Sequence, residues 1–114
     1  RRKLDSKGGD EFYCPKYVLV ELFKHKERIA AATRLDEESL LEWLHGILER
    51  IRFFDEGAIS IGNWAQAWKL CREIDEKDVA YVALALELDA DLWTGDQVLE
   101  TGLRKRGFHR FYSV

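Results

Sequence analysis

The sequence predicts one three-layer α/β/α domain with a short parallel sheet. Short apolar runs typical of strands alternate along the chain with longer segments of helical periodicity, and no hairpin signal separates the strands. With 114 residues, of which 46% are apolar, the chain can bury one core and is too short for two full domains. We therefore expect residues 1–114 to form a single domain.

The expected strands are short. The first, "EFYCP", ends at Pro15, which also suits the first turn of a following helix. Later candidates are "RFF", the pair Leu92 and Trp93, and "FHRFYSV" at the end of the chain. Residues 1–10 show no strand pattern, so we expect them to be a loop or the end of a helix.

The expected helices are marked by residues that cap their ends. Asp36, Ser60 and Asp75 each precede a helical run, and each side chain can accept a hydrogen bond from the first turn. Gly107 suits the end of the last helix, because glycine readily adopts a left-handed conformation. The predicted helices span residues 16–32, 37–51, 61–74, 76–88 and 97–106.

Composition excludes several classes of protein. No apolar run approaches the roughly 20 residues that a membrane-spanning helix needs. Cys14 and Cys71 are far apart and the histidines are scattered, so the spacing of a zinc site is missing, and two reduced thiols in a cytoplasmic protein are expected instead. A net charge of −3 argues mildly against a nucleic-acid partner. Trp64 and Trp68 share a helix face with Cys71, which predicts a place in the core rather than a platform for bases.

Three acids could converge at the edge of the sheet. Asp96 follows a predicted strand, Asp78 begins the preceding helix, and Glu21 interrupts an apolar stretch of the first helix. In open parallel sheets, sites form beyond the carboxyl ends of strands, and clustered carboxylates favour Mg²⁺ or Mn²⁺. Each acid also has a purely structural explanation. Glu21 can pair with Lys24 or His25, Asp78 can belong to a D-x-x-D cap, and Asp96 can cap the last helix.

Two segments resemble a known family. "DVAYVALALELDADLWTGD" is similar to the second half of a PIN domain, with Asp78 and Asp96 separated by a buried helix and a short strand. "FYCPKYVLVELFKHKERI" resembles the family's earlier strand and helix, whose acid matches Glu21. The resemblance implies metal-dependent endonucleolytic cleavage of RNA. It implies a metal site of Glu21, Asp78 and Asp96, supported by the Thr94 hydroxyl, with Asp75 as an auxiliary acid or a helix cap.

The resemblance also suggests partners. An acidic pocket does not attract RNA unaided, so basic side chains of the "KHKER" and "RKR" segments would bind the backbone phosphates. The candidates for phosphate binding are Lys24, Lys26, Arg104, Lys105 and Arg106. Because many PIN domains are toxins of toxin-antitoxin pairs, a cognate antitoxin is a second expected partner.

One departure from the family leaves alternatives open. PIN domains begin with an apolar strand that ends in an Asp, which residues 1–10 do not resemble, and Asp5 has no strand before it. A sheet without its central strand predicts self-association or strand exchange. It also leaves room for a catalytically inactive PIN-like module that binds RNA or protein. A phosphatase or phosphotransferase, and a Mg²⁺-binding receiver-like domain, are further alternatives without a supporting motif.

Overall fold

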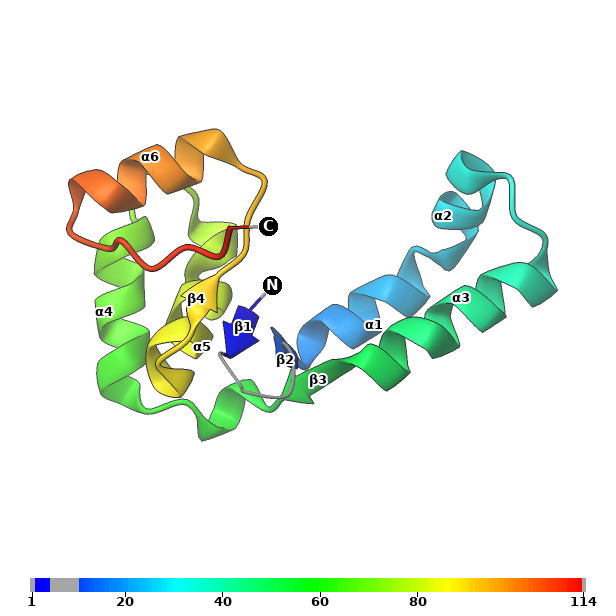
Figure 1. Ribbon diagram of the computed structural model, residues 1–114, viewed down its shortest axis with the longest axis horizontal. Coiled ribbons are helices and arrows are strands. Elements are labelled where there is room, and N and C mark those ends of the chain that lie inside the picture. Colours follow the sequence, from blue (N-terminus) through cyan, green and yellow to red (C-terminus); the bar gives the residue numbers. More distant parts are fainter. Residues whose placement is uncertain (1, 5–10, 114) are drawn as a thin grey trace.

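The computed structural model describes residues 2–4 and 11–113, which form one sheet with helices on both sides (Figure 1). Within that part of the chain there are six α-helices and four strands. In chain order the elements are β1 (Arg2–Leu4), β2 (Glu11–Pro15), α1 (Tyr17–Lys24), α2 (Lys26–Thr33), α3 (Glu37–Arg50), β3 (Ile51–Phe54), α4 (Ile61–Cys71), α5 (Val79–Leu88), β4 (Asp91–Leu92) and α6 (Gln97–Lys105). Single 3₁₀ turns, η1 (Glu56–Ala58) and η2 (Glu76–Asp78), precede α4 and α5.

The sheet has the order β3-β2-β1-β4 and is mixed rather than wholly parallel. β2 and β3 pair in parallel, whereas β1 is antiparallel to both β2 and β4. Since β2 and β4 are each antiparallel to β1, the strands β2, β3 and β4 all run in one direction. Their carboxyl ends therefore meet at one edge of the sheet, as the sequence predicted for the α/β fold.

β1 corrects the expectation for residues 1–10. Arg2–Leu4 is neither loop nor helix but a strand between β2 and β4, the central place that the sequence left unfilled. A three-residue strand with two basic side chains shows no apolar alternation, so only its pairing with both neighbours reveals it. The remainder of the segment, including Asp5, lies outside the described residues.

The predicted helices occur in the expected order, with changed bounds. The helix expected at 61–74 ends at Cys71, and the one expected at 76–88 begins as the turn η2 and becomes α5 only at Val79. Asp36 accepts a hydrogen bond from the Ser39 amide at 2.7 Å, and Ser60 accepts one from Asn63 at 3.3 Å. The first helix, predicted to be continuous, divides at His25 into α1 and α2. The expected C-terminal strand is reduced to a parallel bridge between Leu92 and Phe111.

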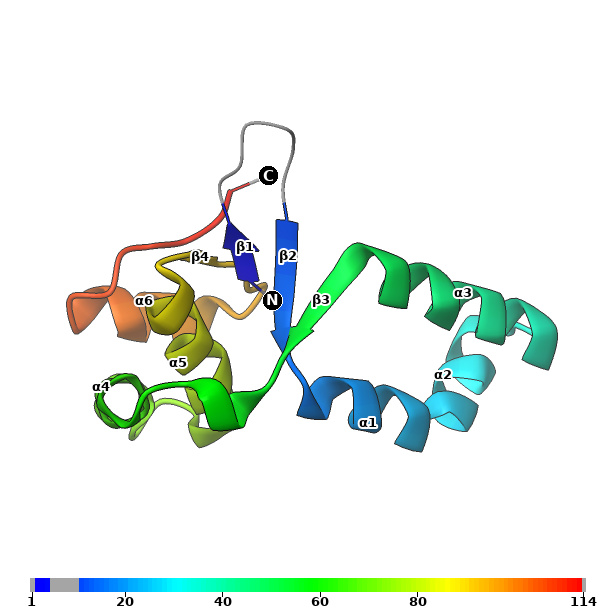
Figure 2. The same ribbon diagram turned by 90° about the horizontal axis from the view of Figure 1, so that it is seen from below.

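The core lies on one side of the sheet, among α4, α5 and α6. α5 packs across β2, β1 and β4, and its residues 82–85 are all buried. The helical arm, which we define as α1, α2 and α3, leaves the sheet where β2 and β3 lie and projects away from the core in both views (Figure 2). None of the residues of α1 and α2, all of which the structure describes, is buried.

Two further observations concern exposed surfaces. The prediction that Trp68 lies in the core is wrong, because 46% of its surface is exposed and it stacks against Arg72 instead. Trp64 packs against the core as expected and donates a hydrogen bond to the Glu56 carbonyl. Among the described helices, none combines the length and the apolar character that crossing a bilayer requires.

Candidate metal centre

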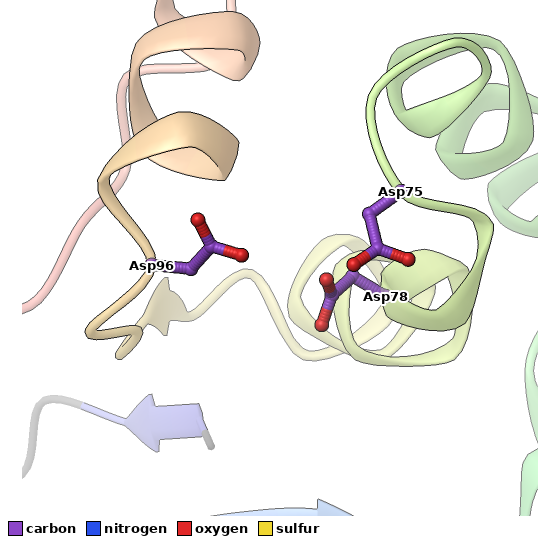
Figure 3. Close-up of side chains that lie close together, drawn as sticks. All are labelled: Asp75, Asp78 and Asp96. Carbon is purple, nitrogen blue, oxygen red and sulfur yellow. The ribbon is translucent and has the colours of Figure 1, made fainter.

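Asp75, Asp78 and Asp96 form an acidic cluster at the carboxyl edge of the sheet. One carboxylate oxygen of each lies within 4.8 Å of the others. Figure 3 shows Asp96 facing the other two acids across the gap between the start of α6 and the turn before α5. Asp75 and Asp78 are half-buried and Asp96 is exposed, so the cluster is open to solvent on one side.

Local turn geometry holds two of these acids on one side of the cluster. Asp75 caps η2, where its Oδ1 accepts a hydrogen bond from the Lys77 amide at 2.9 Å. Asp78 lies at the end of η2, immediately before α5, and makes no side-chain cap hydrogen bond to that helix. The D-x-x-D turn therefore uses the carboxylate of Asp75 as a cap and presents that of Asp78 to the cluster.

Asp96 serves as a helix cap and as a member of the cluster at once. Its Oδ1 accepts hydrogen bonds from the amides of Val98 at 3.0 Å and Leu99 at 3.1 Å, which caps α6. The hydroxyl of Thr94 accepts a hydrogen bond from the Asp96 amide at 3.0 Å, so Thr94 supports the turn that carries Asp96, and its role at a metal site stays a prediction. The two explanations that the sequence left open for Asp96 are compatible, because a carboxylate has two oxygens.

The electrostatic setting suits negative charge and a hard cation. α5 and α6 both begin at the cluster, and helix N-termini carry partial positive charge that favours carboxylates. Carboxylate oxygens that bind one Mg²⁺ directly lie at most about 4.2 Å apart. A spread of up to 4.8 Å therefore fits a divalent ion after a small side-chain rotation or with a water in one position.

Glu21 does not belong to this cluster among the described residues. Its Oε2 lies 3.2 Å from Nε2 of His25, one turn further along the helical arm, and both side chains are substantially exposed. The pairing with His25 is one of the two structural explanations that the sequence offered. A role for Glu21 at the metal site thus remains a prediction from the family resemblance.

Of the predicted phosphate-binding residues, the two arginines are engaged by other groups of the chain. Lys24 and Lys26 lie at the junction of α1 and α2, and Lys105 is exposed at the end of α6. Arg104 forms an ion pair with Glu100 at 3.0 Å and stacks over the Phe111 ring.

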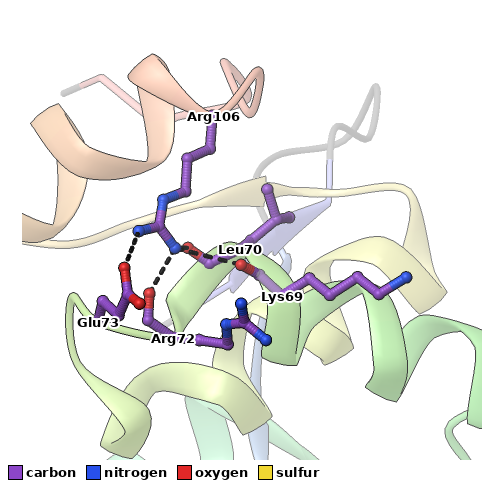
Figure 4. Close-up of polar contacts among 5 residues, drawn as sticks. All are labelled: Lys69, Leu70, Arg72, Glu73 and Arg106. Carbon is purple, nitrogen blue, oxygen red and sulfur yellow. Dashed lines mark hydrogen bonds and ion pairs between the residues drawn. The ribbon is translucent and has the colours of Figure 1, made fainter.

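Arg106 has a structural task that its sequence position did not reveal. Its guanidinium donates hydrogen bonds to the carbonyls of Lys69, Leu70 and Arg72 at the end of α4, and it pairs with Glu73 at 3.7 Å (Figure 4). These contacts satisfy carbonyls that have no partner within the helix. Arg106 therefore ties the end of α6 to the end of α4.

A small cavity of about 180 Å³ connects the cluster to aromatic side chains. It is lined by Asp78 and Thr94 together with Tyr81 and Trp93. The sequence identified neither aromatic residue as part of the site, although Trp93 directly precedes Thr94 in the segment that carries the resemblance. That adjacency was the available signal.

Comparison with known families decides the kind of domain. A model of the PIN domain matches residues 1–111. The chain belongs to the PIN domain family. Searches of curated proteins and of solved structures find no match. PIN domains are generally metal-dependent nucleases, so the acidic cluster lies in a fold of the nuclease superfamily.

Proposed function

We propose that this PIN domain is an endoribonuclease that hydrolyses RNA phosphodiester bonds with Mg²⁺ or Mn²⁺. The observation that carries the proposal is the cluster of Asp75, Asp78 and Asp96 at the carboxyl edge of the sheet in a chain of this family. When bound, the ion would activate water and stabilise negative charge on the phosphate. The products would be 5′-phosphate and 3′-hydroxyl ends.

The protein's own contribution is positioning. The hydrogen bonds from Val98 and Leu99 fix one oxygen of Asp96, and the Thr94 hydroxyl fixes the backbone before it. Asp75 is fixed in the same way by the Lys77 amide. Because these carboxylates are held by the backbone, little reorganisation is needed when a cation and a phosphate arrive.

Substrate phosphates also require cations. The candidates are Lys24 and Lys26 on the helical arm and Lys105 at the end of α6 opposite Asp96, which would bind phosphates away from the one at the cluster, since surface lysines bind phosphate without a fixed geometry. Arg104 and Arg106 contribute less in this proposal, because Glu100 and the carbonyls at the end of α4 already engage their guanidinium groups.

The test compares two helix caps, only one of which lies in the cluster. Asp96→Asn and Asp36→Asn should both preserve their helices, since Asn caps about as well as Asp. Cleavage of single-stranded RNA in Mn²⁺ should fall roughly 100-fold or more in Asp96→Asn and stay unchanged in Asp36→Asn. Excess Mn²⁺ should raise the melting temperature of wild type and Asp36→Asn more than that of Asp96→Asn. Equal cleavage by both variants would overturn the assignment of the site.

One alternative is supported by a specific observation. The described residues bring together three acids rather than four, and Glu21 is engaged by His25. A catalytically inactive module would bind RNA or protein without cutting it. Retained RNA binding with no metal-dependent cleavage by the wild-type chain would favour this alternative.

The proposal extends to partners and location. A toxin role with a cognate antitoxin predicts that expression of the chain slows growth; normal growth with cleavage intact would remove the toxin role alone.

We also propose self-association through exposed apolar residues of the helical arm, among them Val20 at 64% exposure, Phe23 and Leu41. Sedimentation analysis tests this, and a monomer would contradict it. The buried cysteines Cys14 and Cys71 support a reducing, cytoplasmic setting.

A further inference from the structure

A second, larger cavity adjoins, at Trp93, the small cavity that reaches the acidic cluster. It has a volume of about 450 Å³, within the range of roughly 300–1,000 Å³ that is typical of ligand pockets. We call it the aromatic groove, and it is lined by Phe12, Trp43, Gly46, Ile47, Arg50, Ile51 and Trp93. Trp93 also lines the small cavity that holds Asp78 and Thr94, so the groove and the metal centre share a wall. We propose that the aromatic groove receives an unpaired base of the RNA strand, beside the phosphate at the acidic cluster.

The aromatic walls are the first argument for a base. The rings of Phe12 and Trp93 lie 5.3 Å apart, and Tyr112 packs edge-on against both of them. On the opposite wall, α3 contributes Trp43, which is 44% exposed. Bases of single strands stack on such rings with little dependence on sequence, since every base has a π face.

Charge is the second argument. Arg50 ends α3 at the groove, and its side chain is exposed there. A guanidinium can stack on a base or bind the phosphate that precedes it. An apolar groove with a cation at its rim matches a nucleotide, which combines a flat base with a negative phosphate.

Gly46 supplies the third argument. Glycine in the middle of a helix is destabilising relative to alanine. A Cβ at Gly46 would meet no heavy atom within 4 Å, so packing within the chain does not require this glycine. Its missing side chain leaves the wall of the groove open at this point, with room for a ligand.

The inference rests on the proposed function, because it places the base relative to the phosphate that is cut. Its test therefore measures binding separately from cleavage. A short, fluorescein-labelled single-stranded RNA is titrated with the full chain in chelator, and anisotropy reports the dissociation constant. Trp43→Ala should weaken binding roughly 5- to 150-fold. Trp68→Ala is the matched control, since Trp68 is equally exposed but lies on α4.

Gly46→Leu provides a variant that fills the groove without removing a contact. It should weaken RNA binding to a similar extent while the protein keeps or gains thermal stability, because the helix gains a better residue. An RNA with an abasic site at one position near the cut should bind wild type more weakly than the intact RNA does. It should lose nothing further with Trp43→Ala, because the ring and the base belong to one interaction.

The outcomes separate the two proposals. If the wild-type chain does not cleave RNA, and Trp43→Ala still weakens RNA binding, the nuclease proposal is contradicted and the groove proposal is supported. Cleavage that requires Asp96, with equal affinities for Trp43→Ala, Trp68→Ala and wild type, would overturn the groove alone. If Gly46→Leu abolishes self-association in sedimentation analysis and leaves RNA affinity unchanged, a second copy of the chain occupies the groove, and the inference is wrong.

Discussion

The α4–α6 side of the molecule and the helical arm are built on different principles. The central core cluster, with Val82, Leu84 and Leu103 among its members, is drawn from residues 59–108. In the arm only Leu40 and Leu44 are buried, and both belong to α3. Stability should therefore reside in the core side, whereas the arm offers surface. The acidic cluster lies on the stable side, and the aromatic groove lies where the two regions meet.

The largest expected effect comes from replacing a leucine with alanine in each region. Leu84→Ala should cost about 2–5 kcal/mol, because Leu84 is fully buried and its loss leaves a cavity in α5. Leu41→Ala should change stability by less than about 0.5 kcal/mol, because the side chain is 47% exposed. Urea unfolding measures both. Similar costs would mean that the arm is covered in solution, which would agree with self-association.

Hydrogen exchange of the unaltered chain should show the same division. Amides of α5 should exchange only through global unfolding, because residues 82–85 are buried on the sheet. Amides of α1 and α2 should exchange through local opening of much lower free energy, since neither helix buries a residue. Uniform protection across the chain would contradict the comparison. If added RNA slows exchange of the α3 amides more than that of the α1 amides, the RNA contacts the arm at the aromatic groove.

Two helical glycines give a smaller and more discriminating contrast. Gly46→Ala in α3 should stabilise the chain by roughly 0.5–1 kcal/mol, because the added Cβ meets nothing. In α6, a Cβ at Gly102 would lie 2.6 Å from Cδ1 of Ile74, so Gly102→Ala must displace that side chain and should lose the benefit. Thermal melts of the two variants provide the measurement. An equal gain for both would show that Ile74 moves without cost.

The contrast also explains how far the sequence could predict the fold. Local patterns sufficed to predict the helices of the core side, because caps such as Ser60 and the apolar run of α5 are recognisable in adjacent residues. They failed for β1, because three residues carry no periodicity and their strand exists only through its neighbours. They failed at His25 too, where the chain turns between α1 and α2 within a run that the sequence predicts as one continuous helix.

The candidate site was predicted in the same uneven way. Asp78, Asp96 and Thr94 lie in one segment, and a single buried helix and strand fix their relation. Asp75 joins them because the turn before α5 is short. Glu21 comes from the arm, and no local pattern specifies how that helix lies relative to α5. Sequence spacing thus predicted that Asp78 and Asp96 approach one another within the core side, and it did not predict contacts between the two regions.

The smallest effect separates the regions by pH. Hydrogen bonds, chiefly from the Ser60 amide and then from the Asn63 side chain, lower the pKa of Glu87. A carboxyl group whose pKa is lower in the folded state adds stability above its ordinary pKa, and that contribution disappears as the pH falls through the folded pKa. The pKa of Asp36 in the arm is lowered in the same way by the Ser39 amide. Both carboxylates bridge a helix start, but only Glu87 joins two elements of the core side.

Replacing these carboxylates with amides should consequently have different results. Glu87→Gln should reduce the global free energy of unfolding near pH 7, and the difference from wild type should shrink as the pH is lowered below the ordinary range of a glutamate. Asp36→Asn should leave global unfolding nearly unchanged at every pH, because Asn keeps the cap and the arm contributes little to the cooperative core. Urea titrations between pH 7 and pH 3 follow both variants. A larger pH-dependent loss for Asp36→Asn than for Glu87→Gln would show that the arm folds cooperatively with the core, and the division between the two regions would then not hold.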